Sequence, residues 1–167
     1  GARVARYRLF LLLSVGVFAL DQLTKWLVAA RFAFNPRHLH GGGIDRPVID
    51  GFFYLIHVGN TGAAWSMFAG QGIFLAILAG LTLAGIYLWR HALGLRGTGA
   101  QISFGLLCGG IVGNLVDRLL HGHVIDFIDL HFGSYIYPTF NVADSAITCG
   151  AALMIWEALF PAKAART

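Results

Sequence analysis

The sequence predicts an all-α membrane protein with four transmembrane helices and a small β-sheet outside the bilayer. Its 167 residues fit a single integral membrane domain. Apolar residues make up 57% of the chain and charged residues only 12%, and the mean hydropathy is +0.69. A soluble domain carries about 25% charged residues. The composition therefore excludes a disordered chain and a soluble enzyme of ordinary type.

Four apolar segments approach the roughly 20 residues that a helix needs to cross a bilayer. The expected spans are about 9–30, 72–89, 100–117 and 143–160, with outer loops at about 31–71 and 118–142. The first span is too long for a cleaved signal peptide and has the wrong flanks. It carries Asp21 and Lys25, which are four residues apart and are expected to form a structural pair on one helix face.

The Lys and Arg residues indicate that both termini are cytoplasmic. Seven of them lie in the terminal segments and the middle loop, and four lie in the outer loops. They sit between apolar runs and form no stripe, so the net charge of +4 favours membrane topology over nucleic-acid binding. Both cysteines lie inside apolar runs, which argues against a disulfide framework.

The two outer loops contain strand-like segments. Residues 52–58 are rich in aromatic and branched side chains and end at the turn-like residues 59–62. Residues 124–131 also have strand composition, and residues 135–137 can pair with them. We expect a small sheet that rests on the outer membrane surface.

Two spans carry small residues at intervals of four, which lets helices approach closely in lipid. These residues are Gly105, Gly109 and Gly113 in the third span, and Ala76, Gly80 and Ala84 in the second. We expect both grooves to serve helix packing.

Four acidic residues surround the second outer loop: Asp117, Asp126, Asp129 and Asp144. Carboxylates near hydrocarbon are costly and mark functional sites. Two of them at close range share a proton, as in aspartic proteases, because both cannot ionise cheaply.

Each acid also has a structural interpretation. Asp144 can be a helix N-cap, and Asp117 can form an ion pair with the adjacent Arg118. Asp126 and Asp129 can be solvated loop residues. The residues alone do not decide which acids act together.

Amide side chains add weight to a functional site on the outer side. Asn114 lies one helical turn before Asp117 and Arg118, and Asn141 precedes Asp144 by three residues, as a capping or orienting residue does. Asn60 lies in the other outer loop. Helix packing alone seldom uses so many polar groups.

Other chemistries have weaker support. His121 and His123 lie near Asp126, but two histidines and one aspartate are a loose zinc signal, and surface histidines are the better interpretation. A small four-span transporter is the alternative function, although a transporter places its key acid near the bilayer midplane. Only Asp21 is a candidate for that position, and Lys25 stands beside it.

Five sequence blocks resemble the bacterial lipoprotein signal peptidases, also called signal peptidase II, in the order found in that family. They are DQLTK at 21–25, NTGAA at 60–64, GNLVDR at 113–118, GHVIDF at 122–127 and FNVADS at 140–145. The resemblance implies an intramembrane aspartyl endopeptidase in the cytoplasmic membrane, with four spans, an extracytoplasmic sheet that cradles the substrate, and an outer loop. It implies no cofactor and no metal. Residues 34–47 look longer than the matching loop of the family.

The resemblance implies that Asp126 and Asp144 are the catalytic pair. It assigns substrate binding or support of the pair to Asn60, Gly62, Asn114, Arg118, Asn141, Asp21 and Lys25, and leaves Asp117 a structural role. The implied substrate is a prolipoprotein with a diacylglyceryl-modified cysteine, cut just before that cysteine. Membrane lipids are the other expected partners, and the chain is expected to act as a monomer.

Overall fold

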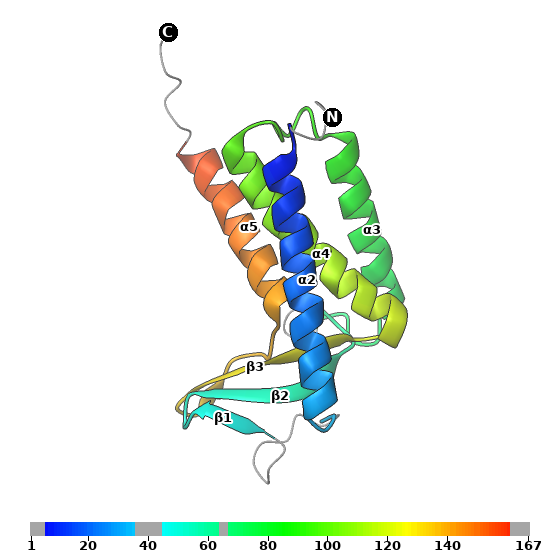
Figure 1. Cartoon of the computed structure of the whole chain (residues 1–167). Helices are drawn as coiled ribbons and strands as arrows, with labels where there is room; N and C mark the ends of the chain where they lie inside the picture. The colour runs from blue at the N-terminus through cyan, green and yellow to red at the C-terminus, as the bar shows by residue number, and fades with distance from the viewer. Residues whose placement is uncertain (1–5, 36–44, 64–66, 161–167) are drawn as a thin grey trace.

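The computed structural model describes residues 6–35, 45–63 and 67–160. The glycine triplet at 41–43, most of the long 34–47 stretch and several of the counted basic residues lie outside these ranges. The described chain forms a helical bundle with a sheet at one end (Figure 1).

The bundle consists of α2 (Arg8–Arg31), α3 (Gly72–Leu88), α4 (Thr98–His121) and α5 (Val142–Leu159). Three of these helices, α2, α4 and α5, are long and apolar enough to cross a membrane. The fourth, α3, has 17 residues and is about 26 Å long at 1.5 Å per residue, slightly less than the hydrocarbon core. The four predicted spans are thus present as helices. The third continues to His121, so Arg118 lies on a helix and not in a loop.

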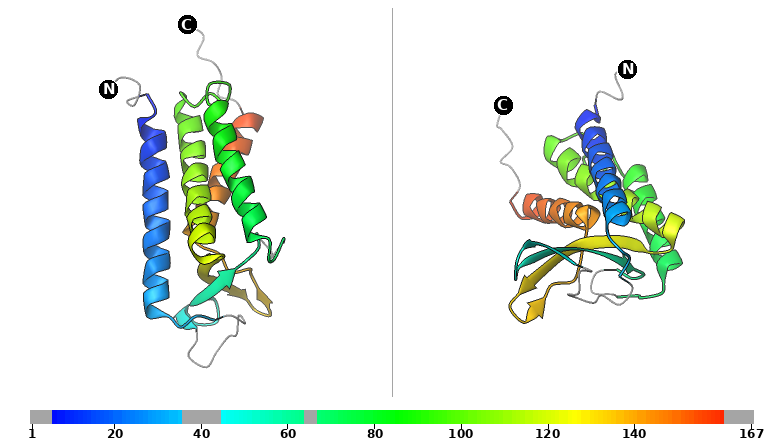
Figure 2. Two further views of the ribbon diagram at one scale, coloured as in Figure 1. Left: turned by 90° about the vertical axis from the view of Figure 1, so that its right-hand side faces the viewer. Right: turned by 60° about the horizontal axis from the view of Figure 1, so that its bottom comes forward.

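The helix α4 lies at the centre and packs against α2, α3 and α5 (Figure 2). Its glycines allow this approach, as predicted. A Cβ on Gly109 would lie 2.7 Å from the Ser14 carbonyl oxygen of α2, and one on Gly110 would lie 2.5 Å from the Ala143 carbonyl oxygen of α5. Small residues therefore let α4 pack closely against both α2 and α5.

The predicted packing groove on α3 is wrong. A Cβ on Gly80 would have nothing within 4 Å, and Ala84 is exposed. The helix packs instead through larger side chains such as Ile86, which joins Phe104 and Cys108 of α4 in the apolar core. Because lipid is as apolar as these side chains, spacing alone does not show which face meets protein.

The sheet has four antiparallel strands in the order β1-β2-β3-β4. They are β1 (Arg46–Ile49), β2 (Phe53–Asn60), β3 (Val124–Phe132) and β4 (Tyr135–Ile136). The predicted strands at 52–58 and 124–131 and the pairing of 135–136 with the latter are confirmed. The expected turn at Gly59 and Asn60 is wrong, because both residues still pair with β3. The strand β1, which contains Pro47, was not predicted.

The sheet lies at the end of the bundle where α2 ends and α5 begins, opposite to the start of α2 and the end of α5 (Figure 1). In the chain, β3 follows directly on α4, and α5 begins shortly after β4. This connectivity brings the end of α4, the strand β3 and the first turn of α5 to one place.

Candidate active site

A buried charged triad joins three elements of the bundle. The Lys25 ammonium lies 2.8 Å from Asp21 Oδ2 and 2.8 Å from Asp117 Oδ2. None of the three side chains is more than 2% exposed. A charge buried without a partner would be strongly destabilising, so each carboxylate compensates the cost of burying the ammonium. The predicted pairing of Asp21 with Lys25 is confirmed.

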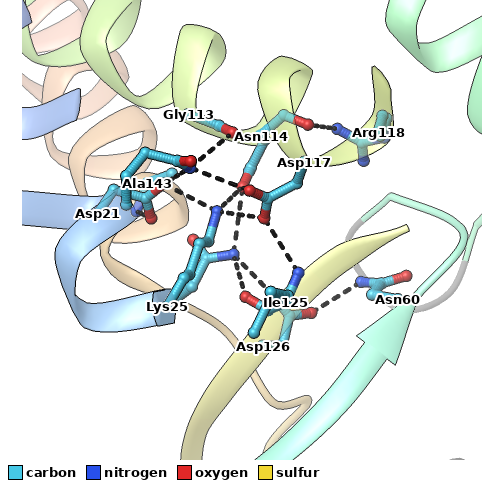
Figure 3. A network of polar contacts seen from close by, with 12 residues as sticks. Asp21, Lys25, Asn60, Gly113, Asn114, Asp117, Arg118, Ile125, Asp126 and Ala143 are labelled. Atoms are coloured by element: carbon cyan, nitrogen blue, oxygen red, sulfur yellow. Dashed lines mark hydrogen bonds and ion pairs between the residues drawn. The ribbon is translucent and has the colours of Figure 1, made fainter. Parts of the chain in front are cut away.

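Both carboxylates of the triad also accept backbone hydrogen bonds. Asp21 Oδ1 accepts the Ala143 amide in the first turn of α5 at 2.9 Å, and Asp117 Oδ2 accepts the Ile125 amide of β3 at 3.1 Å (Figure 3). Gln22 donates to Asp117 Oδ1 at 2.9 Å and to the Gly113 carbonyl oxygen at 3.3 Å. The triad therefore fixes α2, α4, β3 and α5 relative to one another.

Two asparagines connect the charged triad to Asp126 and Asp144 by hydrogen bonds. Asn114 Oδ1 accepts from Lys25 Nζ at 3.0 Å, so its amide nitrogen points the other way and donates to Asp144 Oδ1 at 2.7 Å. Asn141 donates its side-chain amide to Asp126 Oδ1 at 2.7 Å and its backbone amide to Asp144 Oδ2 at 3.3 Å. Asn141 thus contacts both acids.

The local structure explains these positions. Asn141 is the N-cap of α5: its side-chain oxygen accepts the Asp144 amide at 2.9 Å, and Asp144 returns a bond to the Asn141 amide. This reciprocal capping box satisfies two backbone donors at the helix start. Asp144 is therefore the third residue of the helix and not its N-cap, which corrects the structural interpretation made from sequence. The capping role expected for Asn141 is confirmed.

The end of β2 completes the surroundings of Asp126. Asn60 donates to Asp126 Oδ2 at 3.1 Å, and its own oxygen accepts the Gly62 amide at 2.8 Å. Arg118 holds the same segment through a 2.8 Å hydrogen bond to the Gly62 carbonyl oxygen. The Arg118 Nε is buried and has no hydrogen-bond partner among the described residues.

Burial changes the acidity of Asp126. Its side chain is 2% exposed, and burial, followed by the negative charge of Asp144, raises the pKa of Asp126 from 3.8 to about 8. The hydrogen bonds from Asn60 and Asn141 and the charge of Lys25 oppose this rise. Burial thus favours the neutral form of Asp126, and a neutral carboxyl can donate a hydrogen bond.

The other acids have different places. Asp117 pairs with Lys25, not with the adjacent Arg118, whose guanidinium donates to backbone oxygens instead. Asp129 is fully buried and contacts His131 at 2.7 Å and Thr139 at 3.1 Å, so neither it nor Asp126 is a solvated loop residue.

The structure connects every residue that the sequence proposed for the site in one hydrogen-bonded network. Gln22 belongs to this network and was not singled out, although an amide next to Asp21 in an apolar span was a visible signal. His121 and His123 lie with their rings 6.1 Å apart. Within the described ranges, no three His, Cys, Asp or Glu side chains are grouped so as to hold a metal ion.

Fold and site together define a membrane-embedded enzyme with a pair of carboxyl groups at one end of a four-helix bundle. Comparison with known sequences identifies the family of the chain. The sequence matches the Signal peptidase (SPase) II family over residues 13–160. The chain belongs to this family and is a protease of the aspartic type.

Individual relatives agree in length as well as sequence. A lipoprotein signal peptidase of Paraburkholderia phymatum is 42% identical over 92% of this chain and 89% of its own, and one of Bacillus subtilis is 37% identical over 90% and 93%. A bacterial membrane enzyme solved by the in meso method at 2.3 Å resolution has a TM-score of 0.81 and 30% identity, over 95% of this chain and 93% of that one.

Proposed function

We propose that the protein removes the signal peptide from diacylglyceryl-modified prolipoproteins by cutting the peptide bond just before the lipidated cysteine. Asp126 and Asp144 are the catalytic residues. The observation that carries this proposal is that Asn141 donates hydrogen bonds to both acids, to Asp126 Oδ1 at 2.7 Å and to Asp144 Oδ2 at 3.3 Å. The raised pKa of Asp126, which is due to burial and to the charge of Asp144, supports it. Such a pair supplies a base and an acid at one pH.

In the first step, the Asp144 carboxylate takes a proton from a water molecule, and the water oxygen attacks the scissile carbonyl carbon. The protonated Asp126 gives its proton to the carbonyl oxygen, and a neutral tetrahedral diol forms. The first turn of α5 favours negative charge on Asp144, because the positive end of the helix dipole lies there.

In the second step, the diol collapses. Asp144 returns its proton to the cysteine nitrogen, the carbon–nitrogen bond breaks, and Asp126 recovers a proton from a diol hydroxyl. The products are a signal peptide with a free carboxyl group and a lipoprotein with a free cysteine amine. This sequence needs no covalent enzyme intermediate.

The remaining polar groups position the reactants. Lys25 orients Asn114 toward Asp144, with Asp21 and Asp117 holding Lys25. Arg118 and Gly62 hold Asn60 against Asp126.

The site lies where apolar helices meet the sheet, which suits a substrate held by its own lipid. We propose that this end faces the extracytoplasmic side of the cytoplasmic membrane, with both termini cytoplasmic. Confinement to the bilayer aligns the reactants and replaces a large soluble cleft. One chain supplies the whole network, so the enzyme acts as a monomer. The transporter alternative is not favoured, because its candidate acid, Asp21, is fully paired.

The test is cleavage of a diacylglyceryl-modified prolipoprotein by purified protein in detergent. Asp126→Asn and Asp144→Asn are each expected to lose activity by about 10²–10⁴-fold, the usual contribution of a general acid or base. Asp129→Asn is the matched control, because Asp129 is a buried acid on the same strand with partners elsewhere. Full activity in either of the first two variants would refute the catalytic pair.

A further inference from the structure

A pocket lies between the end of α2 and the sheet, and neither Asp126 nor Asp144 lines it. Its volume is about 580 Å³, within the range of small-molecule sites. Its walls are mostly apolar, with Leu27 and Val28 from α2, Leu55 from β2 and Phe127 from β3. Thr24, Phe32 and two arginines complete the lining.

The two arginines come from different elements. Arg31 lies in the last turn of α2, and Arg46 begins β1. Both are exposed, and neither guanidinium makes a hydrogen bond or ion pair with any residue that the structure describes. Among the described residues, no acidic side chain lines the pocket. Two guanidinium groups beside an apolar floor fit an anion that carries hydrocarbon.

The interaction of Arg31 with the helix dipole does not explain this arrangement. A cation in the last turn of a helix is favourable by itself. Arg46 lies on a strand, where no helix dipole acts on it, and it lines the same pocket. A helix dipole therefore does not account for both arginines.

The position of the pocket along the helix bundle favours a lipid as its ligand. It lies where the apolar helix α2 ends and the sheet begins. Trp26, just over one turn before Arg31, is 65% exposed. Exposed tryptophans of membrane proteins gather at the headgroup level. This position suits contact of the two arginines with lipid phosphates and of the apolar floor with an acyl chain.

We propose that this pocket binds one anionic phospholipid from the leaflet on the sheet side. Arg31 and Arg46 contact the headgroup phosphate, for which the planar guanidinium is well suited. An acyl chain packs on Leu27, Val28 and Phe127. The bound lipid bridges α2 and β1 and so ties the sheet to the membrane. A diacylglyceryl-modified cysteine has no phosphate, so the two arginines are expected to favour a phospholipid over the lipid of the substrate.

Native mass spectrometry of the purified protein in detergent tests the site with four probes: dioleoyl phosphatidylglycerol, dioleoyl phosphatidylcholine, dioleoylglycerol and glycerol 1-phosphate. The native chain is expected to retain one phosphatidylglycerol in preference to the other three. Arg31→Gln/Arg46→Gln is expected to bind it about 30-fold more weakly, the combined effect of two cations near an anionic headgroup.

The matched control is Arg8→Gln/Arg96→Gln, which removes the same charge at the other end of the bundle and is expected to bind like the native chain. Leu27→Trp fills the pocket without changing net charge and is expected to weaken binding; it decides the matter if the double arginine variant does not fold. Equal weakening in the control would indicate unspecific attraction and overturn the proposal. So would unchanged binding after loss of both arginines or in Leu27→Trp. Equal binding of phosphatidylcholine, dioleoylglycerol or soluble glycerol phosphate would overturn the assignment of an anionic phospholipid.

Discussion

The ammonium of Lys25 lies 3.0 Å from Asn114 Oδ1, while Asn114 Nδ2 lies 2.7 Å from Asp144 Oδ1. One amide therefore relays the position of a buried cation on α2 to an acid on α5. An ammonium has only donors, so the amide oxygen must face Lys25 and the amide nitrogen must face Asp144. Lys25 thus orients the Asp144 carboxylate, which we propose to be catalytic, through the Asn114 side chain.

Replacement of Lys25 by methionine is expected to destabilise the fold by about 3–5 kcal/mol, because Asp21 and Asp117 would then be buried without a cation. Thermal unfolding in detergent measures the effect. Arg8→Met, on the same helix but exposed, is the control and should change stability by about 1 kcal/mol or less. Similar losses in both variants would contradict the role of the triad.

The pH dependence of cleavage should show a basic limb near pH 8. Asp126 must hold a proton to act on the carbonyl oxygen, and burial together with the charge of Asp144 raises the pKa of Asp126 to about 8. Activity should therefore fall as pH rises through 8. Infrared difference spectra of native protein against Asp126→Asn should show a protonated carboxyl at pH 6 that disappears above pH 8.

The same shift has a consequence for stability. The folded state holds the Asp126 proton between pH 3.8 and about 8, whereas the unfolded chain releases it near 3.8. The contribution of Asp126 to the free energy of unfolding should therefore decrease as pH rises through this window.

In Asp144→Asn the infrared band of the protonated Asp126 carboxyl should disappear at a lower pH than in the native protein, because the negative charge of Asp144 no longer raises the pKa of Asp126. An unchanged titration midpoint of this band would contradict the coupling of the two acids.

Asn141 offers a way to separate capping from catalysis. Asn141→Ser keeps an oxygen that can cap α5 but removes the amide that donates to Asp126 Oδ1. Cleavage should fall, mainly in kcat. The unfolding temperature should fall less than in Asn141→Ala, because the cap is kept although the hydrogen bonds to Asn114 Oδ1 and the Ile125 carbonyl oxygen are lost. Asn141→Ala should lose activity and also about 1 kcal/mol of stability. If the serine variant were as active as the native chain, the contact with Asp126 would have no functional role.

Gly109 and Gly80 form a matched pair. Gly109→Ala would place a Cβ 2.7 Å from the Ser14 carbonyl oxygen and should destabilise the protein by about 1–3 kcal/mol through overpacking. Gly80→Ala meets nothing within 4 Å and should be neutral or stabilise α3 by up to about 1 kcal/mol. Thermal unfolding of the two variants side by side checks both, and equal effects would refute the packing assignment.

Much of the fold was predictable because the membrane requires long apolar helices, and their ends were placed within four residues. The strand β1 was not, because Pro47 lacks an amide and argues against a strand within a sheet interior. It is accommodated at the sheet edge. The extension of β2 through Gly59 and Asn60 depends on pairing with β3, which local turn preferences do not reveal.

The site was predictable in composition but not in pairing. Residue chemistry indicated carboxylates and amides at one end of the bundle, and only the resemblance selected Asp126 over Asp129. The structure shows how the surroundings of these two acids differ. These acids are three residues apart on β3, and side chains at odd spacing point to opposite faces of a strand, so Asp126 meets Asn60 and Asn141 while Asp129 meets Thr139. Lys25 as the partner of Asp117 is a contact between helices, which sequence proximity to Arg118 obscured.

The hydrogen bond from the Ala143 amide to Asp21 joins residues 122 positions apart in the chain. During synthesis, α2 is therefore made well before α5 supplies the backbone amide that donates to its buried Asp21 carboxylate. A partly synthesised chain has α2, α4 and β3 but neither Asp144 nor the α5 turn that closes the network. With Asp126 and Asp144 as the proposed catalytic pair, a chain interrupted before α5 is therefore expected to be inactive, so that synthesis of α5 sets the time at which hydrolysis can begin.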